Sequence, residues 1–331
     1  MSDYFYSSAR VRALETALVG TDALARLARA GSVETAYAQL AEYGLTVLRN
    51  ADGKVRIEET LLSRLRGAYK EIEALTAESD PRAILLWRYQ YDCNNLKAAI
   101  KGFLREIDPL PMTFDFGTVS AEEICRAVRT KDFSMLPSML ARGAEEALAV
   151  FARTKDPQRI DLTLDRACYC AMLDAAEQSG DNFAIRLVKT KIDLINLVTC
   201  IRIMRMNRAE AGELLLSEAL LEGGTLSIDF IKELFQTEER LLWERLLYSD
   251  YKSFAESLGT GISLGAIERA ADNTFMATVR EARFVACGPE VLIGYLLGVE
   301  CEVRNLRMIL SGLAGGLSAE ILTERIRDSY V

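Results

Sequence analysis

The stretch Asp92-Cys93-Asn94-Asn95-Leu96-Lys97 decides the fold, because its pattern of an acidic residue followed three positions later by Asn-Leu occurs three times. The other copies are Asp193-Leu194-Ile195-Asn196-Leu197-Val198 and Glu302-Val303-Arg304-Asn305-Leu306-Arg307. Their asparagines are 101 and 109 residues apart, and none of the other asparagines in the chain has this surrounding pattern. The spacing indicates an internal repeat with a period near 100 residues.

A second pattern lies 30 to 40 residues before each asparagine. There the chain reads Leu62-Ser63-Arg64-Leu65, Leu164-Asp165-Arg166-Ala167 and Ile267-Glu268-Arg269-Ala270. Each repeat is therefore expected to end in a similar pair of helices. Helix-breaking sequences near positions 106 and 223 divide the chain, because proline removes backbone donors and glycine favours turns. We predict three helical repeats, at 1–106, 107–222 and 223–331.

Apolar residues recur at helical spacing along most of the chain. The stripe from Leu61 to Leu75 predicts an amphipathic helix, and the one weak strand candidate is Leu45 to Leu48. Further helices are expected at 82–104, 120–128, 138–153, 160–178, 182–207, 208–221, 228–247, 263–285, 290–312 and 318–328. The sequence therefore predicts an all-α fold.

The repeated acid and amide are unfavourable inside helices, so something must compensate for their cost. At a spacing of three residues they share one helix face, where they could bond each other or the backbone of a neighbouring helix end. The leucine that follows each asparagine should point into the core. Two interpretations remain: equivalent polar anchors around a pseudo-threefold axis, facing a shared cavity, or hydrogen bonds that only hold each unit together.

Composition excludes several functions. The net charge of -8 disfavours nucleic-acid binding, and the longest strongly apolar run, Val291 to Val299, is too short to cross a membrane. The amino-terminal residues do not form a secretory signal. With no histidine in the chain, histidine-based catalysis is excluded. The seven cysteines read as reduced thiols, and Cys168-Tyr169-Cys170 lacks a second pair for zinc. We predict no catalytic, cofactor-binding or metal-binding residues.

Two rival functions fit parts of the sequence. Asp161 and Asp165 lie one helical turn apart and could share Mg²⁺ in an all-helical lyase or prenyl-transfer enzyme, although no second acidic cluster accompanies them. A peptide-binding helical-repeat adaptor usually has a period of about 30 to 50 residues, much shorter than this one. The glycine-containing segment from Gly259 to Gly265 has no lysine, which a phosphate-binding loop requires, so it is interpreted as a loop between helices.

The sequence resembles the family of the C subunit of V/A-type ATPases, called the d subunit in eukaryotic V-ATPases. Tyr6-Ser7-Ser8-Ala9-Arg10-Val11-Arg12 looks like the family's Tyr-Val-Asn-Ala-Arg-Val-Arg opening, and Asp92 to Lys97 looks like its D-x-x-N-L-K helix. Ser8 departs from the usual asparagine, and Val198 stands where the first repeat has Lys97. The second copy has thus lost one charge.

This resemblance implies a funnel of three helical domains, peripheral to the cytoplasmic face of the membrane. The protein would be a non-catalytic rotor subunit that links the central-stalk subunits to the proteolipid rotor ring. It would transmit torque for ATP-coupled transport of H⁺ or Na⁺, without entering the membrane and without a cofactor.

Two groups of arginines are candidate partner interfaces. Arg202, Arg205 and Arg208 recur every three residues and could form a cationic ridge that meets acidic groups on the stalk or ring. A solvated helix face is the alternative. Arg10 and Arg12 should project to different sides of a helix, so that one could bind a partner while the other is buried or solvated.

Overall fold

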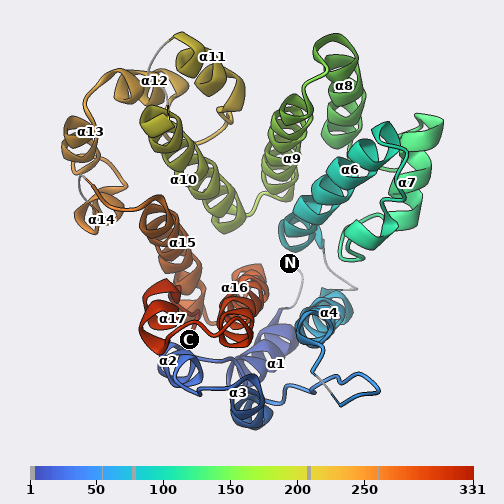
Figure 1. The fold of residues 1–331 in the computed structure, drawn as a ribbon, viewed down its shortest axis with the longest axis vertical. Helices are drawn as coiled ribbons and strands as arrows, with labels where there is room; N and C mark the ends of the chain where they lie inside the picture. The colour runs from blue at the N-terminus through green and yellow to red at the C-terminus, as the bar shows by residue number, and fades with distance from the viewer. Residues whose placement is uncertain (1–3, 54, 77–79, 207–209, 259–260) are drawn as a thin grey trace. The chain divides into compact units, whose positions relative to one another are not determined.

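In a computed structural model, the described part of the chain comprises residues 4–53, 55–76, 80–206, 210–258 and 261–331. Every regular element in these ranges is a helix (Figure 1). The predicted all-α class is confirmed. The weak strand candidate at Leu45 to Leu48 is wrong, because these four residues have no regular structure and the bridge that follows, between Arg49 and Val55, is isolated.

The chain divides into two compact units, and the first contains both ends of the described chain. Unit 1 comprises Met1–Pro81 and Leu247–Val331. Its helices are α1 (Phe5–Glu15), α2 (Thr21–Ala28), α3 (Val33–Leu40), η1 (Ala41–Tyr43), α4 (Ile57–Thr76), α14 (Lys252–Glu256), α15 (Leu264–Arg280), η4 (Glu281–Phe284), α16 (Pro289–Ala314) and α17 (Ala319–Arg325).

Unit 2 comprises Arg82–Leu246. Its helices are α5 (Arg82–Leu85), η2 (Leu86–Arg88), α6 (Tyr89–Leu104), η3 (Leu110–Met112), α7 (Ala121–Thr130), α8 (Ser138–Thr154), α9 (Pro157–Ser179), α10 (Asn182–Met206), α11 (Glu210–Ala219), α12 (Ile228–Gln236) and α13 (Glu239–Leu246). The division into two units does not test the three-repeat boundaries, which stay a prediction.

Several predicted helices differ in detail from the observed ones. The expected helix at 228–247 is interrupted, because Thr237 adopts an extended backbone and its hydroxyl donates to the carbonyl of Leu234 at 2.7 Å. The segment predicted as one helix at 82–104 consists of α5, η2 and α6. Helices α2 and α3 were not predicted, and each has only eight residues, too few for a long apolar repeat.

One long helix organises the core of each unit. In unit 1, α16 packs against α1, α2, α3, α4 and α15, so segments from both ends of the described chain share one core. In unit 2, α9 packs against α6, α8 and α10. Gly143 of α8 permits a close approach, because a Cβ there would overlap the Cβ of Ala167 in α9. The glycine therefore sets how near α8 and α9 lie.

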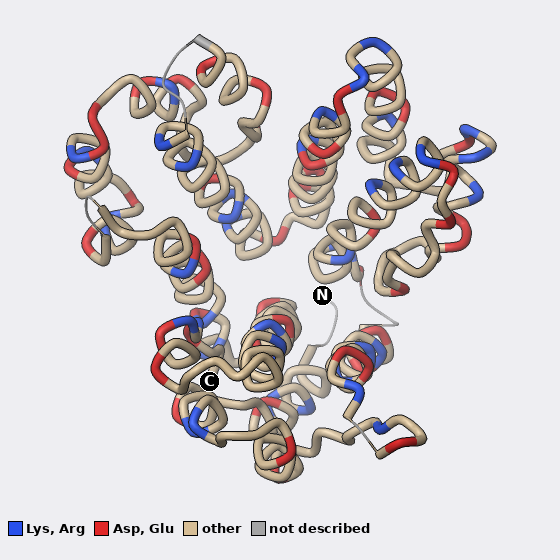
Figure 2. Tube along the Cα trace, viewed as in Figure 1, with Lys and Arg blue, Asp and Glu red and all other residues tan. Residues whose placement is uncertain are grey.

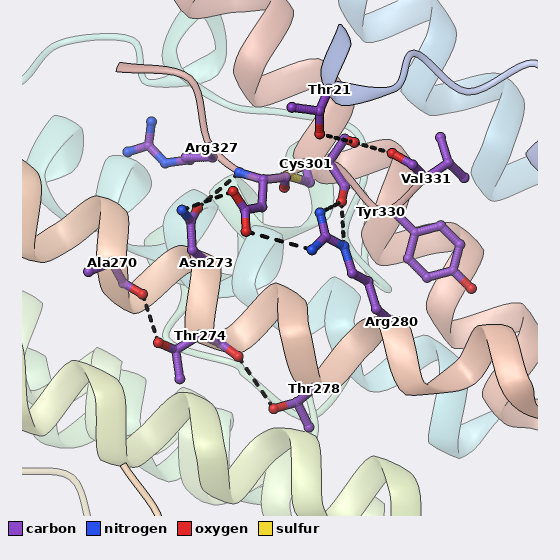
Figure 3. Close-up of polar contacts among 12 residues, drawn as sticks. Thr21, Ala270, Asn273, Thr274, Thr278, Arg280, Cys301, Arg327, Tyr330 and Val331 are labelled. Carbon is purple, nitrogen blue, oxygen red and sulfur yellow. Dashed lines mark hydrogen bonds and ion pairs between the residues drawn. The ribbon is translucent and has the colours of Figure 1, made fainter. Parts of the chain in front are cut away.

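The segment Ile326–Val331 has no regular structure, but it is bound closely to the helices of unit 1 (Figure 3). Asn273 of α15 donates to the Asp328 carboxylate at 3.1 Å and accepts from the Asp328 amide at 2.9 Å. Arg280 Nε donates to the carbonyl of Ser329 at 2.7 Å, and the Ser329 and Thr21 hydroxyls share a hydrogen bond of 2.9 Å. The segment thus ties α15 to the start of α2.

Tyr330 provides the apolar part of this attachment. Its side chain is 1 % exposed and lies against Gly294 and Gly298 of α16, where a Cβ would come within 3 Å of the tyrosine side chain. Its hydroxyl donates to Glu15 of α1 at 3.0 Å. Because the two glycines leave room for the buried tyrosine ring, the segment packs directly against α16.

Replacing Tyr330 with alanine should destabilise unit 1 by about 3 kcal/mol, because it removes a buried aromatic ring and leaves a cavity against α16. Chemical denaturation measures the effect. Tyr248→Ala is the matched control, since Tyr248 is 93 % exposed, and it should change stability by less than about 0.5 kcal/mol. Equal losses for the two variants would show that the 326–331 segment does not stabilise the unit.

Candidate functional site at the repeated acid and amide

The three repeated asparagines make the same pair of hydrogen bonds. In each copy the side-chain amide donates to the carbonyl, and the side-chain oxygen accepts from the N–H, of a single residue 19 to 25 positions later. The pairs, with donated and accepted distances, are Asn95 with Phe114 (2.7 and 2.9 Å), Asn196 with Leu221 (2.8 and 2.9 Å) and Asn305 with Arg327 (3.0 and 2.9 Å).

The two repeated aspartates hold the residues directly before the next helix. Asp92 accepts from the amides of Thr118 at 3.0 Å and Val119 at 3.2 Å, and from the Thr118 hydroxyl at 2.6 Å. Ser120, the N-cap of α7, follows immediately. In the second copy, Asp193 accepts from the amides of Thr225 at 2.9 Å and Leu226 at 3.1 Å, just before Ser227 caps α12.

The third acid, Glu302, binds a segment near the amino-terminal end of the described chain. Glu302 accepts from the amide of Val19 at 2.8 Å, directly before Gly20, the N-cap of α2. It also accepts from Arg64 Nε of α4 at 2.9 Å. The position of Val19 relative to α2 therefore matches that of Val119 relative to α7. An amino-terminal segment completes the third anchor, while Arg327 supplies the partner of its asparagine.

The acids and asparagines are 0 to 2 % exposed, which explains why each is bonded to backbone groups. Burial raises the pKa of Asp92, although the bonds from Thr118 and Val119 oppose the rise. The leucines after the asparagines, Leu96, Leu197 and Leu306, are fully buried, as their position on the helix predicted. The anchor side chains thus lie inside their units and hold loops rather than facing solvent.

A glycine-containing pattern in two of the held loops was not recognised from the sequence. Phe114-Asp115-Phe116-Gly117-Thr118-Val119-Ser120 and Leu221-Glu222-Gly223-Gly224-Thr225-Leu226-Ser227 share an apolar residue, an acid, Gly-Thr, an apolar residue and a serine cap at the same spacing. The glycine is required because a Cβ at Gly117 or Gly224 would overlap the aspartate oxygen that the loop binds. This shared spacing is the signal that could have identified the anchors' partners.

The charged residues after two of the repeats form ion pairs. Lys97 of α6 pairs with Asp165 of α9 at 2.5 Å, and one turn further Lys101 pairs with Asp161 at 2.5 Å. The two carboxylates considered as Mg²⁺ ligands are therefore neutralised by lysines. No group of three or more potential metal-binding side chains occurs within the described ranges.

Arg307 of α16 pairs with Glu58 of α4 at 2.9 Å, whereas the second repeat has the apolar Val198 at this place.

Cys168 is buried beside Cys93, and this contact together with burial raises the pKa of the Cys168 thiol. Such a thiol is a poor nucleophile and a poor metal ligand.

The predicted arginine ridge is only partly described. Arg205 forms an ion pair with Glu239 at 2.5 Å, Arg202 is exposed, and Arg208 lies outside the described residues. Residues 259–260 of the glycine-containing loop also lie outside them. Acidic and basic positions are interspersed along the helices of both units (Figure 2).

The amino-terminal arginines have different environments. Arg12 donates to the carbonyls of Ala282 and Val285 at 2.7 and 2.6 Å and pairs with Glu15, so it ties α1 to η4. Arg10 forms a half-exposed ion pair with Glu71 of α4.

The described chain is thus an all-α protein in which buried asparagines and acids secure the loops between helices. The sequence model of the ATP synthase (C/AC39) subunit family matches residues 7–325. The chain belongs to that family. No helix in the described ranges is long and apolar enough to cross a membrane.

Related proteins are similar to this one along most of the chain. The C subunit of the V-type sodium ATPase of Enterococcus hirae is 26 % identical over 76 % of this chain and 77 % of its own length. The C subunit of the A-type ATP synthase of Halorubrum lacusprofundi is 26 % identical over 95 and 94 % of the two chains. That of Thermococcus kodakarensis is 24 % identical over 98 and 90 %.

Replacing Asn196 with alanine should lower the free energy of unfolding by about 3 kcal/mol, because the N–H and C=O of Leu221 lose their buried partner. Chemical denaturation monitored by helical circular dichroism provides the measurement. Asn182→Ala, at an exposed position of the same helix, should cost less than about 0.5 kcal/mol. The anchoring role is wrong if both variants are equally stable.

The Asp92 carboxylate should give stability a recognisable pH dependence. Because its pKa is raised above the ordinary 3.8, protonation stabilises the folded state fully below that pH, and this stabilisation is lost as the pH rises through the folded-state pKa. Wild-type stability relative to Asp92→Asn should therefore fall as the pH rises from about 4. Denaturation curves between pH 4 and 8 measure the trend.

Asp132→Asn provides a control of opposite sign. A hydrogen bond from Ser134 lowers the pKa of Asp132, so wild type should gain stability relative to this variant as the pH rises. Parallel trends for the two variants would contradict the assignment for Asp92.

Proposed function

We propose that this chain is a non-catalytic rotor subunit of a V/A-type ATPase, which links the central-stalk subunits to the membrane ring and transmits torque. It would act at the cytoplasmic face of the membrane, in ATP-coupled transport of H⁺ or Na⁺. The observation that carries the proposal is the family match over residues 7–325, which leaves little of the chain for another function.

The internal bonding supports a mechanical role. A subunit that transmits torque must resist deformation, and loops are usually its most compliant parts. Here the loops after α6 and α10 are each fastened at two points, by the asparagine and by the aspartate three residues before it. A force on either loop would therefore pass directly into a buried helix.

The predicted funnel of three repeats, at 1–106, 107–222 and 223–331, would receive the stalk. Among the described candidate interface arginines, Arg10 and Arg202 lie at exposed positions. The Mg²⁺-dependent enzyme gains no support, because both of its candidate carboxylates are paired with lysines.

Removing this subunit from the purified complex should leave ATP hydrolysis but abolish ion transport, because the catalytic part would turn without driving the ring. Reconstituted vesicles allow hydrolysis and ion uptake to be measured on the same sample. Adding back the wild-type chain should restore coupling. Ion transport that stays tightly coupled to hydrolysis without the chain would reject the proposed role.

A further inference from the structure

The helices that precede the second and third anchors each carry an arginine in the same environment. Arg166 of α9 donates to the carbonyl of Glu218 at 2.7 Å, and Arg269 of α15 donates to the carbonyl of Glu324. Glu218 lies three residues before Leu221, the partner of Asn196, and Glu324 lies three residues before Arg327, the partner of Asn305. The two glutamates therefore occupy equivalent positions.

The carboxylates of Glu218 and Glu324 differ in their ion-pair partners. In unit 2 the Glu218 carboxylate accepts from Arg159 at 2.9 Å, and Arg159 lies seven residues before Arg166. The position seven residues before Arg269 is Ile262, which cannot form an ion pair. Among the described residues, the Glu324 carboxylate has no ion-pair partner. The third repeat therefore has the acidic residue, Glu324, but no basic residue at the position that corresponds to Arg159.

The difference arises at the start of the two helices. Arg166 lies nine residues after the first residue of α9, whereas Arg269 lies only five after the first residue of α15. One turn of helix, the turn that carries Arg159 in α9, is thus absent from α15. Beside the shortened helix is a cavity of about 480 Å³, lined by Ser263, Gly265, Met308, Ile321 and Glu324 among others. Its volume lies in the range of small-ligand sites.

We propose that this cavity of unit 1 binds an arginine side chain of a partner protein, which pairs with Glu324 as Arg159 pairs with Glu218. Met308 and Ile321 would contact the aliphatic part of that side chain, and the carboxylate its guanidinium, a combination that suits arginine. That the partner is another member of the rotary complex rests on the proposed function; the chemistry of the site does not.

The other charges in the cavity are compatible with a cationic guest. A second acid, Glu268, and three arginines also line it; Arg327 is paired with Asp272 at 2.6 Å, and Arg269 is bonded to the Glu324 carbonyl. Arg325 is exposed and forms no ion pair within the described chain. It is the group that would favour an anion instead, so the experiment must distinguish Glu324 from Arg325.

The test titrates the full-length protein with N-acetyl-arginine amide and follows the methyl NMR signals of Met308 and Ile321. We expect saturable binding in the millimolar range, weakened about tenfold by Glu324→Gln, because the charge-assisted bond is lost. Because Glu218 is already paired with Arg159, Glu218→Gln should leave binding unchanged.

Three outcomes would overturn the inference. They are no saturable binding to wild type, binding insensitive to Glu324→Gln, or stronger binding of N-acetyl-glutamate amide that Arg325→Ala removes. The partner is tested separately, because Glu324→Lys should reduce retention of the chain in the assembled complex. Normal retention with lost probe binding would reject a member of the complex as the guest without affecting the coupling role.

Discussion

The structure depends on one recurring constraint: a buried asparagine must satisfy the N–H and the C=O of a single distant residue. A side-chain amide has the same donor and acceptor as a peptide unit, so it can pair with the backbone as a neighbouring strand would. Asn95 does this for Phe114, and Asn196 for Leu221, inside an all-helical unit. The acid three residues earlier then receives the amides before the next helix, so both ends of the loop are fixed to one helix face.

The same constraint makes unit 1 depend on both ends of the described chain. Its glutamate binds the amide of Val19, and its asparagine binds Arg327, although these residues are more than 300 positions apart in sequence. Tyr330 and Arg12 add further links between the two ends. Such bonds close a loop that spans most of the chain, at a larger cost in chain entropy than a short loop. Unit 2 needs no such closure, since the partners of Asp92 and Asp193 follow within 33 residues.

The sequence predicted the helical class, most helices and the special character of the repeated acid and amide, because each leaves a local pattern. It could not predict what the anchors hold. The bond from Glu302 to Val19 depends on packing between distant segments, and neither residue indicates the other. The ion pairs of Lys97 and Arg205 likewise depend on which helices are neighbours. By contrast, Gly117 and Gly224 could have been recognised, since their loops share the same spacing.

The most direct test of this account is native-state hydrogen exchange at the amides of Phe114, Leu221 and Arg327. The three amides lie in irregular segments yet donate to buried asparagine oxygens at 2.9 Å. They should therefore exchange as slowly as amides in the middle of α6, α10 and α16, which open only when their unit unfolds. Exchange at the rate of open loops would contradict the claim that the repeated asparagines hold the structure together.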